Sequence, residues 1–85
     1  MIRVTLYSKP GCHLCEMIEP IIQFVQQRRR FDFEKKNILD NPADFQKYQH
    51  DIPVITVNGK EIARHQLTAA ALEAALDKET SRASQ

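Results

Sequence analysis

The chain has 85 residues, of which 42% are hydrophobic and 27% charged, and its formal net charge at pH 7 is +1. A chain of this size forms one small domain with a thin core, and its nearly balanced charge argues against a nucleic-acid partner. No run of about 18 apolar residues occurs, so a membrane-spanning helix is excluded. The first residues lack the apolar core of a secretion signal, which predicts a cytoplasmic protein without a membrane partner.

The first predicted elements are a strand and a helix joined by a tight turn. Residues 2–7 alternate apolar and polar side chains, and residues 8–11 read Ser-Lys-Pro-Gly, which is typical of a turn. Apolar residues then recur at steps of three and four, which predicts a helix over residues 13–29 with one buried face. Pro20 lies inside this helix and is expected to kink it, because proline cannot donate a hydrogen bond to the carbonyl of Glu16.

The remaining pattern predicts a second strand, a short helix, a hairpin and a last helix. Phe31 and Phe33 alternate with charged residues, and Asn41-Pro42 begins a helix that runs to about Gln49. The Asn-Gly pair at 58–59 between two apolar runs predicts a β-hairpin. Thr68 caps a helix from Ala69 to about Lys78. The order is therefore β-α-β-α-β-β-α, with a right-handed crossover giving a parallel pair and the hairpin added antiparallel.

Cys12 and Cys15 stand at the start of the first predicted helix. The unpaired N–H groups and the helix dipole there stabilise a thiolate. Lowering a thiol pKa from about 8.5 to about 6 raises the thiolate fraction at pH 7 from about 3% to about 90%. A disulfide between residues only three apart closes a very small loop, so it lowers the entropy of the unfolded chain little and stabilises the fold little. We therefore interpret the pair as a thiol–disulfide exchange site. His13 is either an imidazolium that lowers the thiol pKa further or a solvent-facing residue of the first helical turn.

These motifs together resemble the thioredoxin fold. The resemblance rests on the cysteine pair after the first strand, on Pro20, on Ile52-Pro53 before the hairpin and on the element order. Residues 7–12, Tyr-Ser-Lys-Pro-Gly-Cys, look more specifically like glutaredoxins and the short glutaredoxin-like redoxins. The resemblance implies an α/β domain over residues 1–78, with a four-stranded mixed sheet flanked by three helices, and leaves residues 79–85 as a polar, frayed tail.

The resemblance also implies roles for individual residues. Cys12 would attack a disulfide and Cys15 would resolve the mixed disulfide. Glu16 or water would accept the proton that Cys15 loses. Pro53 would carry a cis peptide bond facing the cysteines, and the backbone of Ile52 would pair with the extended chain of a substrate. A substrate pocket would be lined by Tyr7, Lys9 and Ile52, and Lys9 matches the family lysine that meets a glutathione carboxylate.

Two departures from the family pattern concern glutathione and proton transfer. Where glutaredoxins carry Gly-Gly-x-Asp to bind glutathione, residues 63–66 of this chain read Ala-Arg-His-Gln, so no bound cofactor is predicted beyond the redox-active disulfide. Leu6 stands where thioredoxins carry a buried aspartate. We expect a monomeric cytoplasmic oxidoreductase, active in electron transport and cell redox homeostasis. Its partners would be protein or low-molecular-weight disulfides, with glutathione or a flavin disulfide reductase as electron donor.

Three features have alternative interpretations. One Cys-x-x-Cys supplies two of the four ligands of a structural zinc site, and the histidines at 13, 50 and 65 lack a paired ligand spacing, so no metal site is predicted. A carrier of an iron–sulfur cluster or of a partner protein on the same fold is the alternative function. Residues 28–30, Arg-Arg-Arg, together with Lys35 and Lys36, are either a docking patch or, as we favour, a cationic last helical turn facing its own dipole followed by solvated charges in the next strand.

Overall fold

The computed structural model describes residues 2–83, which form the predicted elements in the predicted order with one short 3-10 helix in addition. The segment between Asn37 and Asn41, for which no helix was predicted, contains this extra turn. In chain order the elements are β1 (Arg3–Ser8), α1 (His13–Gln26), β2 (Asp32–Asn37), the 3-10 helix η1 (Ile38–Asp40), α2 (Pro42–Tyr48), β3 (Val54–Val57), β4 (Lys60–Arg64) and α3 (Ala69–Ala83).

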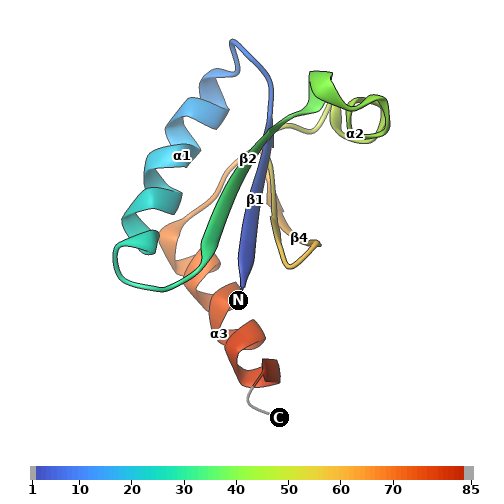
Figure 1. Ribbon diagram of the computed structural model, residues 1–85. Coiled ribbons are helices and arrows are strands. Elements are labelled where there is room, and N and C mark those ends of the chain that lie inside the picture. Colours follow the sequence, from blue (N-terminus) through green and yellow to red (C-terminus); the bar gives the residue numbers. More distant parts are fainter. Residues whose placement is uncertain (1, 84–85) are drawn as a thin grey trace.

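The four strands form one mixed sheet in the order β2-β1-β3-β4. β1 runs parallel to β2 and antiparallel to β3, and β3 runs antiparallel to β4. The parallel pair needs a long crossover connection, and α1 supplies it. Figure 1 shows α1 and α2 on opposite sides of the sheet, with α2 at the end of the sheet where the α1 helix begins. The α/β thioredoxin-type topology expected from the sequence is confirmed.

The main hydrophobic core lies between the sheet and the helices α1 and α3. Alternate side chains of β1 and β3 point to this face and meet one apolar row from each helix. A second, smaller cluster lies on the other face of the sheet, under η1 and α2. The buried members of the main core are Val4, Leu6, Ile18, Ile22, Val25, Phe31, Ile55, Val57, Leu67, Leu72 and Leu76.

Local chemistry accounts for the turns and helix starts that the sequence predicts. Asn58 and Gly59 both have positive φ, +52° and +83°, as a two-residue type I′ hairpin turn requires. The Asn41 carboxamide oxygen accepts hydrogen bonds from the N–H groups of Ala43 and Asp44, which caps α2. The Thr68 hydroxyl accepts from the N–H of Ala71 and caps α3 in the same way.

Both long helices differ from their predicted lengths. α1 ends at Gln26 rather than at residue 29, because the chain tightens into a turn in which the N–H groups of Arg28 and Arg29 both bond to the carbonyl of Val25. The favoured interpretation of a cationic last helical turn is therefore wrong, since the three arginines follow the helix. α1 also continues unbroken through Pro20, which lies exposed on its surface, where water can bond the freed carbonyl.

The helix α3 continues past its predicted end at Lys78 and runs to Ala83. Segment 79–83, expected to be frayed, is therefore helical, and its Glu79 carboxylate accepts a hydrogen bond from the Asn58 carboxamide at 2.9 Å. The rest of the predicted tail, residues 84–85, lies outside the described residues. Among the residues that are described, no helix is both long and apolar enough to cross a membrane.

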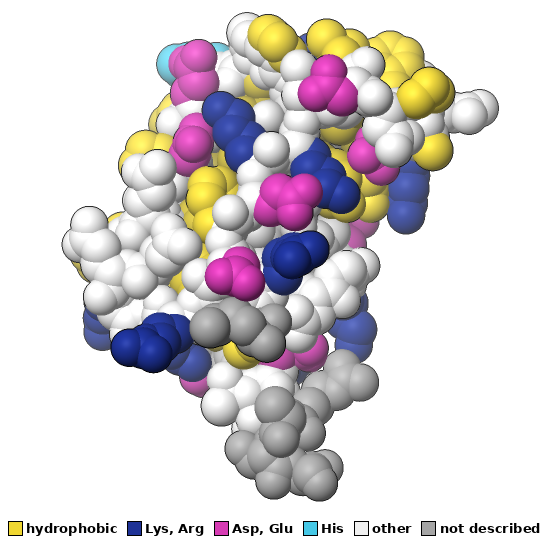
Figure 2. Space-filling view, in the orientation of Figure 1, with side chains coloured by type: hydrophobic (Ala, Val, Ile, Leu, Met, Phe, Trp, Pro, Cys, Tyr) yellow, Lys and Arg dark blue, Asp and Glu magenta, His cyan; other side chains and the backbone are white. Residues whose placement is uncertain are grey.

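Charged side chains of both signs are interleaved over the surface seen in Figure 2. On the strands, the guanidinium of Arg3 and the ammonium of Lys36 both approach the carboxylate of Glu34, at 3.8 and 3.6 Å. Such exposed pairs contribute little to stability. Their mixed arrangement agrees with the nearly neutral composition, because it gives this face no extended field of one sign.

Candidate active site

A tight turn delivers the two cysteines to the start of α1. The N–H of Cys12 donates to the carbonyl of Lys9 at 3.2 Å, which closes a four-residue turn. Pro10 and Gly11 occupy its two central positions, and Gly11 has φ +80°. A type II turn needs a positive φ at the third residue, and proline favours the second, so the local sequence specifies this geometry.

Cys12 and Cys15 are joined by a disulfide, with their Cα atoms 5.3 Å apart. Cys12 is the N-cap of α1, and its Sγ accepts a hydrogen bond from the N–H of Cys15 at 3.2 Å. After reduction the same N–H and the positive end of the helix dipole would face the Cys12 sulfur. Both favour its thiolate form.

The two sulfurs differ in their access to solvent. Cys12 is half-buried, whereas Cys15 is only 3% exposed. An incoming disulfide can therefore reach Cys12 first, while Cys15 lies behind it. This asymmetry is the one that the predicted roles of attacking and resolving cysteine require.

A cavity of about 330 Å³ opens beside the cysteines. Two lysines line it: Lys9, predicted from the sequence, and Lys35 of β2, which the sequence pattern associates with the arginine run and not with the cysteines. Lys35 reaches the cavity because it is the β2 partner of Leu6, and its ammonium is held 3.2 Å from the Glu19 carboxylate of α1. The complete lining is Ser8, Lys9, Pro10, Gly11, Cys12, Cys15, Glu16, Lys35 and Asn37.

Of the three residues expected to line the pocket, only Lys9 does so. Tyr7 and Ile52 pack into the second hydrophobic cluster, because Tyr7 points to the opposite face of the sheet from its neighbour Leu6. The Tyr7 ring lies 4.6 Å from that of Tyr48, measured between centroids. Burial raises the pKa of the Tyr7 hydroxyl, and the nearby Lys36 ammonium opposes that rise.

The Ile52-Pro53 peptide bond is cis, as the resemblance implies. Val54, the next residue, pairs with Tyr7 on β1, so Pro53 lies at the end of the sheet from which the chain leads to the cysteines. Its carbonyl accepts a hydrogen bond from the N–H of His65 at 2.7 Å. The fold therefore brings Pro53 to the same end of the sheet as the turn that carries the cysteines.

The segment that replaces the glutathione-binding glycines is filled by ionic side chains. Arg64 donates two hydrogen bonds to Glu61, at 2.6 and 2.7 Å, and lies 3.2 Å from the Asp51 carboxylate. His65 has φ +71°, a conformation that glycine adopts more readily, and its Nε2 lies 3.8 Å from Asp51. These side chains occupy the surface next to Pro53.

The Glu61–Arg64 pair gives a prediction for the pH dependence of stability. The hydrogen bonds from Arg64 lower the pKa of Glu61 below its ordinary value of 4.5, so the pair stabilises the fold above that pH and loses its effect as Glu61 is protonated at lower pH. Glu61→Gln is expected to lower the free energy of unfolding slightly at pH 7 but not at pH 2, as measured by urea unfolding. Because the pair is exposed, added salt should reduce the difference. An equal difference at both pH values would contradict this assignment.

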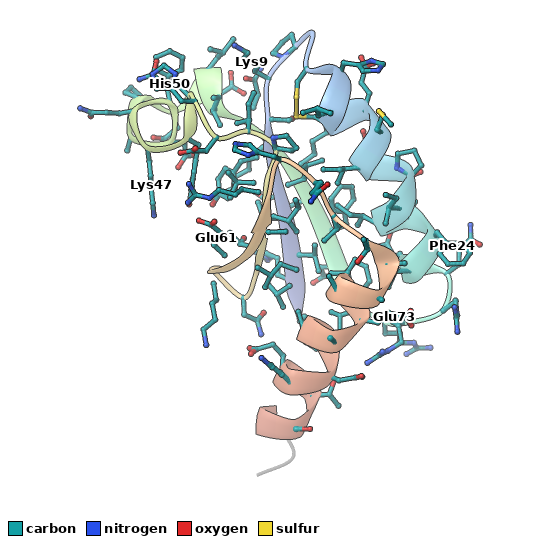
Figure 3. All side chains as sticks on the ribbon, turned by 180° about the vertical axis from the view of Figure 1, so that it is seen from behind. Lys9, Phe24, Lys47, His50, Glu61 and Glu73 are labelled. Carbon is teal, nitrogen blue, oxygen red and sulfur yellow. A yellow bond between two sulfur atoms is a disulfide. The ribbon has the colours of Figure 1, made fainter. Side chains whose placement is uncertain are left out.

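The other sequence candidates lie apart from the cysteines or at the surface. His13 is the exposed first residue of α1, next to Cys12. Figure 3 shows Lys9 near the disulfide and His50 farther away, over α2. Within residues 2–83, the structure gathers no group of three or more histidine, cysteine or carboxylate side chains that could hold a metal ion.

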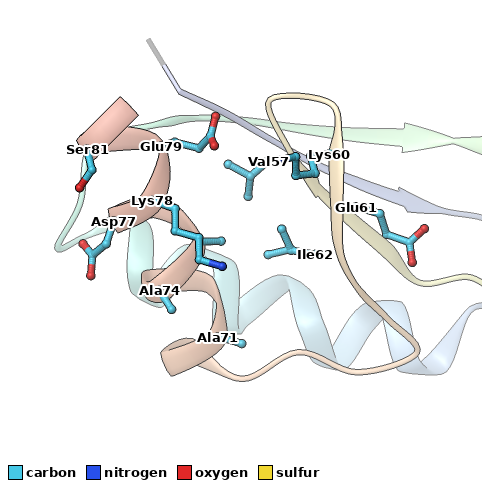
Figure 4. Close-up of a pocket in the computed structure, with 11 residues that line it drawn as sticks. Val57, Lys60, Glu61, Ile62, Ala71, Ala74, Asp77, Lys78, Glu79 and Ser81 are labelled. Atoms are coloured by element: carbon cyan, nitrogen blue, oxygen red, sulfur yellow. The ribbon is translucent and has the colours of Figure 1, made fainter. Parts of the chain in front are cut away.

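A larger cavity, of about 950 Å³, lies between the β3–β4 hairpin and α3 and contains neither cysteine (Figure 4). Its apolar floor includes Val57, Ile62 and Ala75, and Lys60 and Lys78 are among its charged lining residues. Although it is larger, neither cysteine lines it, so we place the active site at the smaller cavity beside Cys12.

The fold and the cysteine site define a protein of the thioredoxin superfamily. A mutant thioredoxin from Halobacterium salinarum superposes with a TM-score of 0.69 over 91% of this chain and 73% of its own. Its sequence identity to this chain is 16%, so this likeness concerns the fold. Protein Ne2328 from Nitrosomonas europaea superposes with a TM-score of 0.75 at 27% identity, over 86% of this chain and 88% of its own.

Sequence comparison identifies the family to which the chain belongs. Residues 3–77 match the model of the Glutaredoxin-like domain, and the chain belongs to this family. A glutaredoxin-like protein of Dictyostelium discoideum is 31% identical over 72 residues, which cover 78% of this chain and 67% of the relative. The family predicted from the cysteine motif and its flanking residues is thereby confirmed.

Proposed function

We propose that this chain is a small dithiol–disulfide oxidoreductase. The observation that carries the proposal is the arrangement of the two sulfurs at the start of α1: Cys12 is accessible and hydrogen-bonded by a helix N–H, and Cys15 is buried one turn behind it. A glutaredoxin-like fold with a closed Cys-x-x-Cys pair supports a redox role of this kind.

The reaction proceeds by two exchanges. The Cys12 thiolate attacks one sulfur of a substrate disulfide, the substrate S–S bond breaks, and its other sulfur leaves as a thiolate that takes a proton from water. Cys15 then gives its proton to Glu16 or water and attacks Cys12 Sγ. The bond between Cys12 and the substrate breaks, the second substrate sulfur leaves as a thiolate and takes up a proton, and the Cys12–Cys15 disulfide forms. Two electrons pass to the substrate, and two substrate thiols result.

The substrates are protein or low-molecular-weight disulfides in the cytoplasm, and the chain acts as a monomer. The backbone next to Pro53 is the surface proposed to pair with an extended substrate chain. We assign no resident glutathione, because residues 63–66 lack the Gly-Gly-x-Asp stretch of glutaredoxins and carry Arg64, which pairs with Glu61 and Asp51 instead. Electrons are supplied by free glutathione or by a flavin disulfide reductase.

The direct test is a disulfide-reduction assay with insulin and with a small mixed disulfide, together with the reduction potential of the cysteine pair. We expect both disulfides to be reduced only when Cys12 and Cys15 are in the reduced form. A potential near about −270 mV identifies a reductant, and one near about −120 mV an oxidant. If neither insulin nor the small mixed disulfide oxidised the reduced cysteine pair, the proposal would be wrong.

Lys35 is expected to raise the reactivity of the site as a positioning residue. Lys35 lines the cysteine cavity and its ammonium pairs with Glu19, so Lys35→Met removes a positive charge near the site and should raise the pKa of the Cys12 thiol and slow its alkylation at pH 6 by about 3- to 10-fold. The measurement is the iodoacetamide rate as a function of pH. Lys36→Met is the matched control, because Lys36 approaches the Tyr7 ring on the other face of the sheet. Identical pH profiles for the two variants would refute the role.

A further inference from the structure

The outer surface of α1 carries a second row of apolar side chains, of which three are exposed and one packs partly against the main core. Leu14, Met17 and Phe24 are 48%, 58% and 52% exposed, and Ile21 between them is half-buried. The steps between these four residues are three, four and three, so they lie along one line of the helix. Figure 3 shows Phe24 projecting outward from α1. We call these four residues the outer row.

The outer row repeats the spacing of the row that builds the core. The buried residues of α1 are Cys15, Ile18, Ile22 and Val25, which also follow steps of three, four and three. The buried row packs on the sheet, whereas the outer row faces solvent except at Ile21, which also packs against the main core. Isolated exposed apolar residues are ordinary, but a continuous row at this spacing is the pattern of a helix that packs against another helix.

Arginines at the carboxyl end of the outer row indicate the kind of surface that could bind there. The guanidinium of Arg28 lies 5.9 Å from the centre of the Phe24 ring and continues the row by one more step of four. Arg29 is neutralised by Asp77 at 2.7 Å and by Glu73 at 4.0 Å. Over the part of the chain that the structure describes, neither Arg28 nor Arg30 has an ion-pair partner. A complementary surface is therefore apolar along its length and acidic where it meets these two arginines.

We propose that the outer row docks an amphipathic, acidic helix of a partner protein. The row begins at Leu14, between the two cysteines, so a helix lying on it reaches the redox site with one end. Resting on the proposed function, we identify the partner as a protein that exchanges electrons with Cys12. The partner's acidic side chains would pair with Arg28 and Arg30.

The size of the row indicates a transient complex. A helix of 14 residues is roughly 21 Å long, which is too short to bury the ~800 Å² per partner of a stable interface. Transient redox encounters use contacts of this smaller size. A lipid surface fits less well, because the row is one residue wide and is flanked by the exposed amides of Gln23 and Gln27.

The test is a titration of the oxidised protein with two synthetic helical peptides that carry leucines at heptad positions. One peptide has glutamates and the other lysines at the flanking positions. We expect the acidic peptide to shift the NMR amide signals of the outer row and to bind at least about tenfold more tightly than the basic one. No electron transfer is involved, so a failure of the redox proposal leaves this result unaffected.

Variants locate the site. Phe24→Ser should weaken binding of the acidic peptide by at least about fivefold, and R28E combined with R30E should reverse the preference toward the basic peptide. Leu39→Ser is the matched control, since Leu39 is equally exposed, at 56%, but lies in η1. Circular dichroism verifies that each variant is folded. Equal binding of both peptides, shifts confined to other surfaces, or binding only to phosphatidylcholine vesicles containing phosphatidylserine would overturn the proposal.

Discussion

Cys12→Ser is expected to reduce disulfide exchange to the uncatalysed rate, whereas Cys15→Ser is expected to trap a covalent mixed disulfide. A serine hydroxyl is not ionised near neutral pH and cannot replace the thiolate that the N–H of Cys15 and the α1 dipole stabilise. In Cys15→Ser the first exchange still occurs, but no buried thiol remains to resolve the intermediate. The two variants therefore separate the roles of the two sulfurs.

The measurement is insulin reduction for activity and intact-mass spectrometry for the trapped intermediate. After incubation with a small disulfide, the mass of Cys15→Ser should increase by one half of that disulfide, and a reductant should remove the addition. Cys12→Ser provides the control, because its remaining thiol is buried and should stay unmodified. If Cys12→Ser retained wild-type turnover, or if Cys12→Ser formed the adduct on its remaining thiol at Cys15, the assigned order of attack would be wrong.

Ile22→Ala is expected to have the largest effect on stability. Ile22 is fully buried between α1 and the sheet, and removing its outer carbons leaves a cavity that close-packed neighbours fill only in part. The expected loss is about 2–5 kcal/mol of the unfolding free energy. A domain with a total stability of about 5–15 kcal/mol loses a large share of it through this one change.

Urea unfolding followed by circular dichroism measures this loss, with Met17→Ala as the matched control on the same helix. Met17 is 58% exposed, so its truncation should change the unfolding free energy by less than about 0.5 kcal/mol. Similar losses for both variants would mean that the outer row is buried in solution. This outcome would also remove the basis of the docking proposal.

Local sequence features predict the parts of the site that depend on neighbouring residues. Pro10 and Gly11 specify the turn before the cysteines, Asn41 and Thr68 specify helix starts, and Asn58-Gly59 specifies the hairpin. Each of these features acts through backbone groups within four residues, and the structure shows all of them. Their agreement with one order of strands and helices is the reason the fold class could be predicted.

The sequence-based predictions differ from the structure where segments far apart in the chain pack together. Tyr7 is expected from the sequence to line the pocket, but the pleat of β1 turns it to the opposite face, against Tyr48. The sequence pattern does not associate Lys35 with the cysteines because it is far from Cys15 along the chain, and only the parallel register of β1 and β2 brings it to the cavity. The end of α1 at Gln26 likewise follows from how the chain turns into β2, a packing effect that overrides the helical pattern.

The sequence alone determined the reactive pair, its position at a helix start and the order of the elements, because short-range hydrogen bonding and hydrophobic periodicity are encoded in consecutive residues. The family followed from the resemblance of the cysteine motif and its flanking residues to glutaredoxins. The tertiary structure decided which side chains surround the sulfurs, that Cys15 is buried while Cys12 remains accessible, and that one apolar row of α1 is left uncovered. These properties depend on strand register and on the packing of helices against the sheet, which involve residues far apart in the chain.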